Sequence, residues 1–261
     1  GEMVRDLYQN EPVFRRELDR CEDILRPHLD RPLTDLLYGD SRSLLDDTAY
    51  TQHALFALEW ALARLWASWG IEPTAVFGHS VGEYVALCVA GVWTLEEGLA
   101  IIAERGRLMQ QLGDGWGMTS AQCDVAQVEA ARAGLASLSL AALNAPESVV
   151  VSGLRTELDQ FEARLTAAAV PIKRLPVSQG FHSAQMDAVA ETFARRVCAT
   201  GIHPPRVTVI SSVTGRDIGI EELRDPDYWR RQVRDPVRFQ DAMHTLDNGG
   251  YDVFLEIGPS T

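Results

Sequence analysis

The stretch AVFGHSVGEYVALCVAGV, residues 75 to 92, constrains the fold most because it joins an apolar strand pattern directly to a helix pattern. The sequence G-x-S-x-G between them is typical of a tight strand-to-helix turn, which leaves the hydroxyl of Ser80 exposed. Gly78 and Gly82 are expected to let the strand and the helix approach closely. The N–H groups at the helix start, including that of Val81, could stabilise a negatively charged oxygen. Ser80 is therefore a candidate nucleophile, although the five-residue pattern also occurs by chance.

The rest of the chain alternates helix and strand patterns around this turn. Residues 51 to 70 carry apolar side chains at three- and four-residue steps, which predicts a helix with one face in the core. Short apolar runs at 73–78, 206–213 and 252–258 predict strands. This alternation favours an α/β fold with a mainly parallel sheet.

Between residues 117 and 178 the rhythm changes to β-α-β-β-α-β, which is the order of a ferredoxin-like unit. We expect this segment to form a small subdomain inserted into a larger one. The flanking segments, 1–116 and 179–261, would then form a single α/β-hydrolase-like subdomain. A chain of 261 residues is long enough for this arrangement.

Charge and cysteine usage narrow the class of protein. The net charge is −13 and Lys173 is the only lysine, which argues against a nucleic-acid partner. The four cysteines are widely separated, as in a reduced protein with buried thiols, and no His, Cys or carboxylate set has the spacing of a metal site. With neither a signal peptide nor a membrane-spanning run, the expected location is the cytoplasm.

A serine nucleophile needs a base, and six histidines are available. His182 follows the last predicted strand of the insertion, near the hinge between the subdomains, where a cleft is expected. His79 precedes the serine, so its side chain should point away from the reacting face, and a structural role is expected. Surface or structural roles are also expected for the remaining four, which are His28, His53, His203 and His244.

Two arginines lie on the helix that follows the nucleophile helix, in the segment ERGRLMQ. Arg107 is expected to be an ordinary solvated charge. Arg105 could be the same, or its planar guanidinium could lie in a cleft and bind a carboxylate through two parallel hydrogen bonds. The local pattern leaves both interpretations of Arg105 open.

Taken together, these segments resemble the malonyl-CoA:acyl carrier protein transacylase family, and most of all the acyltransferase domains of polyketide synthases. The similarity runs through essentially the whole chain and includes eight blocks in the family's order: EPVFRRELDRC, TQHALFALEWALARLW, VFGHSVGEYVALCVAGV, ERGRLMQ, LNAPESVVVSG, FHSAQMD, DYWRRQVRDPVRF and FLEIGP. Eight ordered blocks are far more specific than the serine motif alone. The small inserted subdomain also agrees with this family.

The resemblance implies roles for individual residues. The family nucleophile matches Ser80 and its base matches His182. The carboxylate-binding arginine, 25 residues after the serine, matches Arg105. In this family a backbone carbonyl orients the histidine, and the matching position is Gln232.

Further positions are implied to line the acyl site. Gln52 and Asn144 match motif residues near the cleft. Phe181, just before the base, goes with malonyl in this family, and Val81 agrees. Gln179 and the residue after it depart from the usual His-Ala. Gly180 is expected to add room and Gln179 a polar group, so an unusual or polar extender unit stays open.

The implied reaction is transfer of a malonyl-type group in two steps. Ser80 would accept the acyl group from coenzyme A, and the phosphopantetheine thiol of an acyl carrier protein would then remove it. No bound cofactor is implied, since acyl-CoA is a substrate and phosphopantetheine belongs to the partner. The resemblance also implies a ketosynthase and other synthase domains as neighbours, and neither a membrane nor nucleic acid as a partner. Family members begin with a Gly-Gln-Gly loop that supplies a second oxyanion donor, and the sequence opens just after it.

Two other hypotheses remain, and one docking surface is open to two interpretations. An α/β-hydrolase acting as a thioesterase would share the serine turn, but such enzymes place an acidic residue and then the histidine late in the chain. A non-catalytic docking module would share the fold only. For an acidic carrier protein, one candidate surface is a run of arginines, although an ordinary solvated helix face is an equal alternative; the run comprises Arg224, Arg230, Arg231, Arg234 and Arg238.

Overall fold

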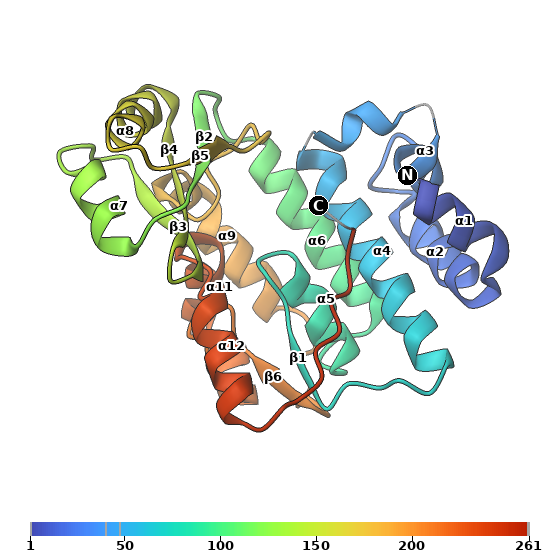
Figure 1. The fold of residues 1–261 in the computed structure, drawn as a ribbon. Helices are drawn as coiled ribbons and strands as arrows, with labels where there is room; N and C mark the ends of the chain where they lie inside the picture. The colour runs from blue at the N-terminus through green and yellow to red at the C-terminus, as the bar shows by residue number, and fades with distance from the viewer. Residues whose placement is uncertain (1, 40, 47, 260–261) are drawn as a thin grey trace.

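The computed structural model describes residues 2–39, 41–46 and 48–259. Figure 1 shows a larger helical body and a smaller lobe that contains β2 to β5 with α7 and α8. The first third of the larger body is helical. Its elements are α1 (Glu2–Asn10), α2 (Pro12–Leu25), α3 (Leu33–Tyr38), the 3-10 helix η1 (Arg42–Asp46) and α4 (Thr48–Ser68).

The long helix α4 confirms the helix predicted from residues 51 to 70 and forms part of the main core. One side of α4 packs on α2 and another on α6 (Leu95–Gln110). Thr94 caps α6 in a reciprocal capping box with Glu97, which satisfies two amide groups at the helix start. Among the residues that the structure describes, no helix is both long and apolar enough to cross a lipid bilayer.

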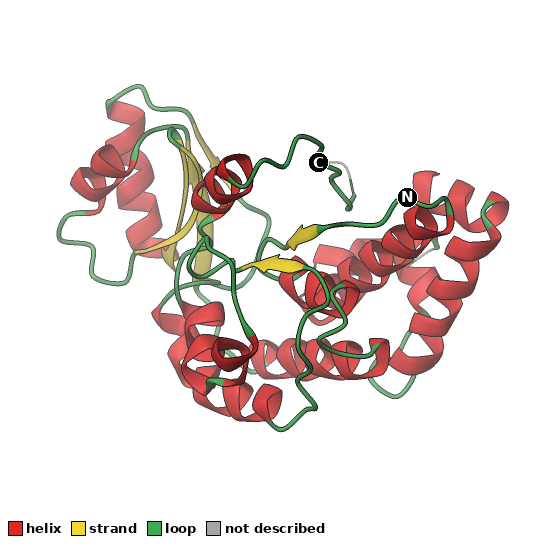
Figure 2. Cartoon of the chain, turned by 90° about the horizontal axis from the view of Figure 1, so that it is seen from below, coloured by secondary structure: helices red, strands yellow, loops and turns green. Residues whose placement is uncertain are grey.

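The nucleophile segment has the predicted order of strand, turn and helix. Strand β1 (Ala75–Phe77) leads through the turn to α5 (Gly82–Val89). Strand β1 pairs in parallel with β6 (Thr208–Ile210) in a two-stranded sheet. In Figure 2 the two strands lie between helical layers. The parallel pairing and the match to known folds reported below confirm the α/β class.

The strand predicted at residues 252–258 does not form. Within the described part of the chain this segment is irregular. Three of its apolar side chains are exposed, among them Val253 at 88% and Phe254 at 55%, whereas Ile257 is half-buried against the main core. Its composition is that of a strand, but a strand exists only where its N–H and C=O groups pair with a neighbour. The described residues offer this segment no pairing partner.

The smaller lobe has the predicted β-α-β-β-α-β order. Its strands form one antiparallel sheet in the order β3-β4-β2-β5, which is the split arrangement of ferredoxin-like units. The helices α7 and α8 cover one face and enclose a separate apolar core with that sheet. The elements are β2 (Trp116–Ala121), α7 (Val125–Arg132), β3 (Ser139–Ala145), β4 (Ser148–Leu154), α8 (Arg155–Ala167) and β5 (Ile172–Arg174). The exact division at residues 117 and 178 stays a prediction.

The last third of the chain returns to the larger body and fastens the two lobes together. Leu143 of β3 donates its N–H to the carbonyl of Val237, and Val237 donates to Ala141. A small apolar cluster that includes Ala142 of β3 and Val150 of β4 joins the small sheet to Phe77, at the end of β1, and to Phe181. The helices of this third are the 3-10 helix η2 (Ala184–Met186), α9 (Asp187–Cys198), α10 (Ile220–Arg224), α11 (Pro226–Arg234) and α12 (Phe239–Asn248).

Candidate active site

The turn after β1 holds Ser80 in a strained conformation. Its φ angle is +54°, a left-handed region that costs a non-glycine residue on the order of 1 kcal/mol or more. Gly78 makes the turn possible, because a Cβ atom there would lie 2.1 Å from the amide nitrogen of Glu83. At Gly82 a Cβ atom would meet only a carboxylate oxygen of Glu59, at 3.5 Å, so the close approach depends on Gly78 and not on Gly82.

His182 comes to this turn from the segment that leaves the small sheet. Its Nε2 lies 2.9 Å from the Oγ of Ser80, and its Nδ1 lies 2.8 Å from the carbonyl oxygen of Asp235. A carbonyl can only accept, so Nδ1 carries the proton and Nε2 is free to accept from the serine hydroxyl. This is the tautomer that a general base requires. His182 is also left-handed, with φ +57°.

The prediction that the backbone carbonyl of Gln232 orients His182 is wrong by three residues. The acceptor belongs to Asp235 and not to Gln232. Helix α11 ends at Arg234, and Asp235 is its C-cap with extended backbone angles, so its carbonyl turns away from the helix axis. Gln232 still reaches the site, but through its side chain, which donates to the carbonyl of Ser80 at 3.1 Å.

Burial determines the protonation state of His182. Only 4% of this residue is exposed, and the loss of solvent lowers its pKa to about 3, with a further contribution from the positive charge of Arg105. The hydrogen bond to Asp235 opposes this shift. The imidazole is therefore neutral near neutral pH and available as a base.

The N–H of Val81 directly follows the nucleophile, and its expected oxyanion role stays a prediction. The next two amides, of Gly82 and Glu83, donate to the carbonyls of His79 and Ser80. Among the described residues, no acceptor faces the N–H of Val81. An unoccupied N–H next to the nucleophile is the kind of donor that stabilises a tetrahedral intermediate.

Arg105 is buried, and no acidic side chain of the described residues pairs with it. Only 2% of the residue is exposed, and its Nη1 donates to Oε1 of Gln52 at 2.6 Å. Its guanidinium carbon lies 5.7 Å from the ring centre of Tyr84. Within the described part of the chain, no Asp or Glu side chain forms an ion pair with it, and its Nε has no partner. Burial lowers its pKa.

A buried cation without an anion is costly to a folded protein. The arrangement at Arg105 is therefore suited to a ligand that brings its own carboxylate. Arg107, two residues later, contrasts with it: its Nε donates to Glu104 at 2.8 Å on the exposed face of α6.

Other predicted site residues lie at the junction between the lobes. Oδ1 of Asn144, on β3, lies 3.1 Å from Nε2 of His79, so the His79 side chain points toward the small lobe. Phe181 packs against both the main core and the junction cluster. Gln179 is buried and its side-chain carbonyl accepts from Gln185 at 2.7 Å.

The room expected at Gly180 is already filled. A Cβ atom there would lie 2.8 Å from the ring of Trp116, at the start of β2. This close contact explains the glycine as a packing requirement. It gives no support to a larger acyl pocket at that position.

Sequence reasoning missed four polar residues around the nucleophile turn: Glu59, Glu83, Tyr84 and Asp235. Burial raises the pKa of Glu59, which lies against Gly82, to about 8. Glu83 and Tyr84 belong to a buried network treated below. For Glu83 and Tyr84 the sequence offered one signal, which is their position directly after G-x-S-x-G. The first turn of α5 packs directly beside the serine, so polar residues there can contact the site.

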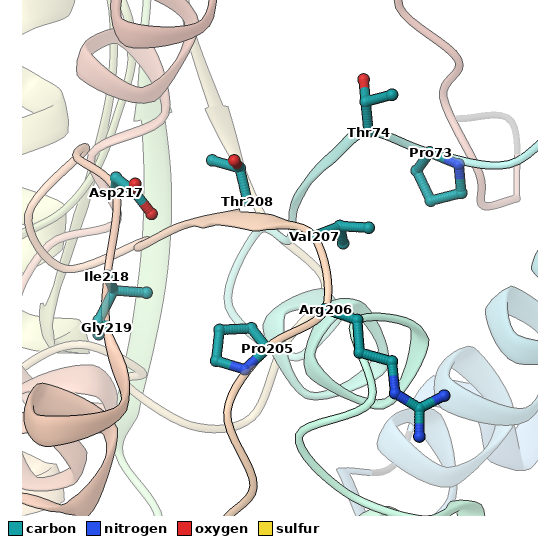
Figure 3. Close-up of a pocket in the computed structure, with 9 residues that line it drawn as sticks. All are labelled: Pro73, Thr74, Pro205, Arg206, Val207, Thr208, Asp217, Ile218 and Gly219. Atoms are coloured by element: carbon teal, nitrogen blue, oxygen red, sulfur yellow. The ribbon is translucent and has the colours of Figure 1, made fainter.

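Two surface grooves lie apart from these residues. One has a volume of about 600 Å³ and lies between Pro73–Thr74 and residues 205–208 and 217–219, which Figure 3 shows as sticks. It lies where β1 and β6 begin, whereas ligands of parallel sheets bind where strands end, as β1 does before Ser80. The other, of about 350 Å³, lies on the small lobe beside Arg155 and Arg174.

Comparison with known proteins decides the family. The acyl transferase domain model matches residues 2–260, nearly the whole chain. The chain belongs to the acyl transferase domain family. This membership and the strand-turn-helix geometry at Ser80 agree with the resemblance stated from the sequence.

Individual acyl transferase relatives are similar over almost all of this chain. The spectinabilin polyketide synthase system protein NorB of Streptomyces orinoci is 42% identical across 99% of the chain, which spans 12% of that relative. The crystal structure of the SpnD acyl transferase domain in complex with 2-(pent-4-yn-1-yl)malonyl has a TM-score of 0.90 at 35% identity, covering 97% of this chain and 60% of the other. The malonyl CoA-acyl carrier protein transacylase of Coxiella burnetii has a TM-score of 0.89 at 26% identity, covering 98% and 82%. This chain therefore spans a small part of the polyketide synthase proteins that it matches.

Proposed function

We propose that this chain transfers a malonyl-type acyl group from coenzyme A to the phosphopantetheine thiol of an acyl carrier protein, in polyketide biosynthesis. The observation that carries the proposal is the Ser80–His182 hydrogen bond beside a buried arginine that pairs with no described acidic side chain. The first element supplies acyl chemistry and the second supplies recognition of a free carboxylate. The relatives named above support the same reaction class.

In the first half-reaction, His182 takes the proton of Ser80 as Oγ attacks the thioester carbonyl. The Val81 N–H donates to the developing oxyanion. The tetrahedral intermediate collapses, the carbon–sulfur bond breaks, and the coenzyme A thiol leaves with the proton from His182. An acyl ester on Ser80 remains.

In the second half-reaction, the phosphopantetheine thiol of the carrier protein enters the same site. His182 takes the thiol proton, and the sulfur attacks the Ser80 ester. The ester carbon–oxygen bond breaks, and His182 returns the proton to Oγ. The products are the acylated carrier and the original Ser80 hydroxyl.

Substrate choice rests on the buried end of the site. Arg105 would pair with the free carboxylate of the acyl group, and Gln52 holds the guanidinium in place. An acetyl group lacks this carboxylate and leaves the charge unpaired. Phe181 favours malonyl itself, and the malonyl derivative in the SpnD complex shows that a related domain holds a substituted malonyl group. Because Gln179 is engaged by Gln185, its polar group is less available for a polar extender.

The partners follow from the reaction. The acyl carrier protein is the acceptor, and a ketosynthase and other domains of the same synthase are the expected neighbours. We propose a cytoplasmic location because acyl-CoA substrates are found there.

Mass spectrometry of the intact protein tests this proposal. After mixing with malonyl-CoA, methylmalonyl-CoA, hydroxymalonyl-CoA and acetyl-CoA in separate reactions, we expect a malonyl adduct on Ser80 and little acetyl adduct. The Ser80→Ala variant should form none. Added carrier protein should remove the adduct and gain its mass.

Rapid release of free malonate that carrier protein does not change would instead establish a thioesterase. If no acyl-CoA of the panel forms an adduct on Ser80 and none is hydrolysed, the result supports a non-catalytic docking module that keeps the fold.

A further inference from the structure

A buried carboxylate lies directly behind the nucleophile turn. Glu83, in the first turn of α5, is completely buried and accepts hydrogen bonds from the backbone N–H and the hydroxyl of Ser212, at 3.2 and 2.6 Å. It also accepts from the hydroxyl of Tyr228 and from the Nε2 of Gln232, the latter at 3.0 Å. These donors are all neutral, and among the described residues no cation pairs with Glu83, so its carboxylate organises polar groups.

Gln232 carries this organisation to the nucleophile. Its Nε2 donates to the carbonyl of Ser80 at 3.1 Å as well as to Glu83, and its Oε1 accepts from the hydroxyl of Tyr84 at 2.6 Å. Both ends of the amide therefore have fixed partners. A buried amide held in this way has a single orientation.

These contacts close a ring that includes both reacting side chains. Ser80 Oγ contacts His182, and His182 contacts the carbonyl of Asp235. Asp235 caps α11, the helix that carries Gln232, and Gln232 returns to the carbonyl of Ser80. The distance between nucleophile and base thus depends on how α11 is held against the turn.

We propose that Gln232, held by Glu83 and Tyr84, is a positioning residue for the Ser80–His182 pair. It fixes the strained turn at its carbonyl and fixes the C-terminal end of α11, from which Asp235 orients the imidazole. This inference rests on the proposed acyl transfer. It adds that the side chain of Gln232 controls the rate of acylation without touching the acyl group.

The test is a single-turnover measurement of Ser80 acylation with malonyl-CoA. Gln232→Met keeps the side-chain length and removes all three hydrogen bonds. We expect the maximal acylation rate to fall on the order of ten- to a hundredfold, the scale for a misplaced reacting pair. The half-saturating malonyl-CoA concentration should stay within about twofold, because neither Arg105 nor Gln52 has a hydrogen bond to Gln232 that the substitution would remove.

The final adduct amplitude separates positioning from damage. A partly unfolded sample gives a low amplitude at a normal rate, whereas a misplaced pair gives full amplitude at a low rate. Glu17→Gln is the matched control, because Glu17 is a buried carboxylate on α2 that accepts from Trp60 away from the site. Its acylation rate should equal that of the unchanged protein.

If Gln232→Met does not fold, Tyr84→Phe decides the question, since it removes one hydroxyl and keeps the ring beneath Arg105. We expect a several-fold lower rate at full amplitude. The positioning role is overturned if the unsubstituted protein acylates and the folded variant, Gln232→Met or Tyr84→Phe, acylates at the same rate. Failure of the unchanged protein to acylate counts against the proposed function itself.

Discussion

Arginines in two regions of the molecule look alike in the sequence and differ in their surroundings. Arg105, inside the larger body, is bonded to Gln52 and pairs with no described acidic side chain. The arginines on and after α11 face solvent and each already has an acidic partner: Arg230 with Asp227 and Glu191, Arg231 with Asp235, Arg234 with Asp187, and Arg238 with Asp241.

This contrast shows where an anionic ligand gains most. A carboxylate that enters beside Arg105 completes a charge pair that the fold leaves open, in surroundings with little water to weaken it. An acidic carrier protein that approaches α11 meets arginines whose charge is already offset. The expected docking role of these arginines is therefore weaker than the sequence indicated.

The largest expected effect is on malonyl transfer when the buried charge is removed. Arg105→Met should lower kcat/KM for malonyl-CoA on the order of a hundredfold or more, because two charge-assisted hydrogen bonds are lost. Acetyl-CoA should be affected far less. The matched control is Arg107→Met on the same helix, where the arginine pairs with Glu104.

Competition between malonyl-CoA and acetyl-CoA, followed by the mass of the Ser80 adduct, measures this change. An unaltered malonyl preference in Arg105→Met would remove the carboxylate-binding role. Equal losses of kcat/KM for malonyl-CoA in Arg105→Met and Arg107→Met would indicate damage to α6 and not the loss of carboxylate binding.

The next effect is on pH dependence, because burial first and the charge of Arg105 second lower the pKa of His182 to about 3. The unsubstituted protein should therefore keep its rate of acylation by acetyl-CoA as the pH falls from 8 to 5. A base with the ordinary histidine pKa of about 6.5 would lose most of its rate over the same range. In Arg105→Met the pKa of His182 should rise, so the acid loss of rate should begin at higher pH.

Stability provides a second measure of the same shift. Below about pH 6.5 the unfolded chain binds a proton at His182 that the folded protein does not, so the folded protein loses stability as the pH falls toward 3. That loss should be smaller in Arg105→Met. Initial rates are compared only where circular dichroism shows a folded protein, and superimposable pH–rate curves for both proteins would contradict the coupling.

Local patterns predicted much of this fold and site. The strand-turn-helix at Ser80 and the β-α-β-β-α-β unit depend on neighbouring residues and turn chemistry, which a sequence displays directly. The strand at residues 252–258 failed because strand formation depends on a partner elsewhere. The pattern of that segment contains no information about whether a partner is present.

Long-range contacts account for the other errors. Gln232 was assigned by matching a family position, whereas the carbonyl that faces His182 is set by where α11 ends, at Arg234, with Asp235 as the cap. The room expected at Gly180 is filled by Trp116, from a strand that begins 64 residues earlier. The environment of Arg105 required the positions of three helices, which is why the sequence alone left its role open.

The smallest expected effect concerns the surface arginines and the acidic carrier protein. Arg234 and Asp187 form one of the exposed pairs, with side chains 34% and 61% exposed, and such pairs typically contribute about 0 to 1 kcal/mol. If the pair is self-contained, Arg234→Gln and Asp187→Asn should each change the rate of acyl transfer from Ser80 to the carrier protein by less than about twofold. If Arg234 instead attracts the carrier, the first substitution slows transfer and the second accelerates it, most clearly at low salt. Because both variants leave the first half-reaction untouched, opposite changes confined to the second would restore α11 as the docking surface.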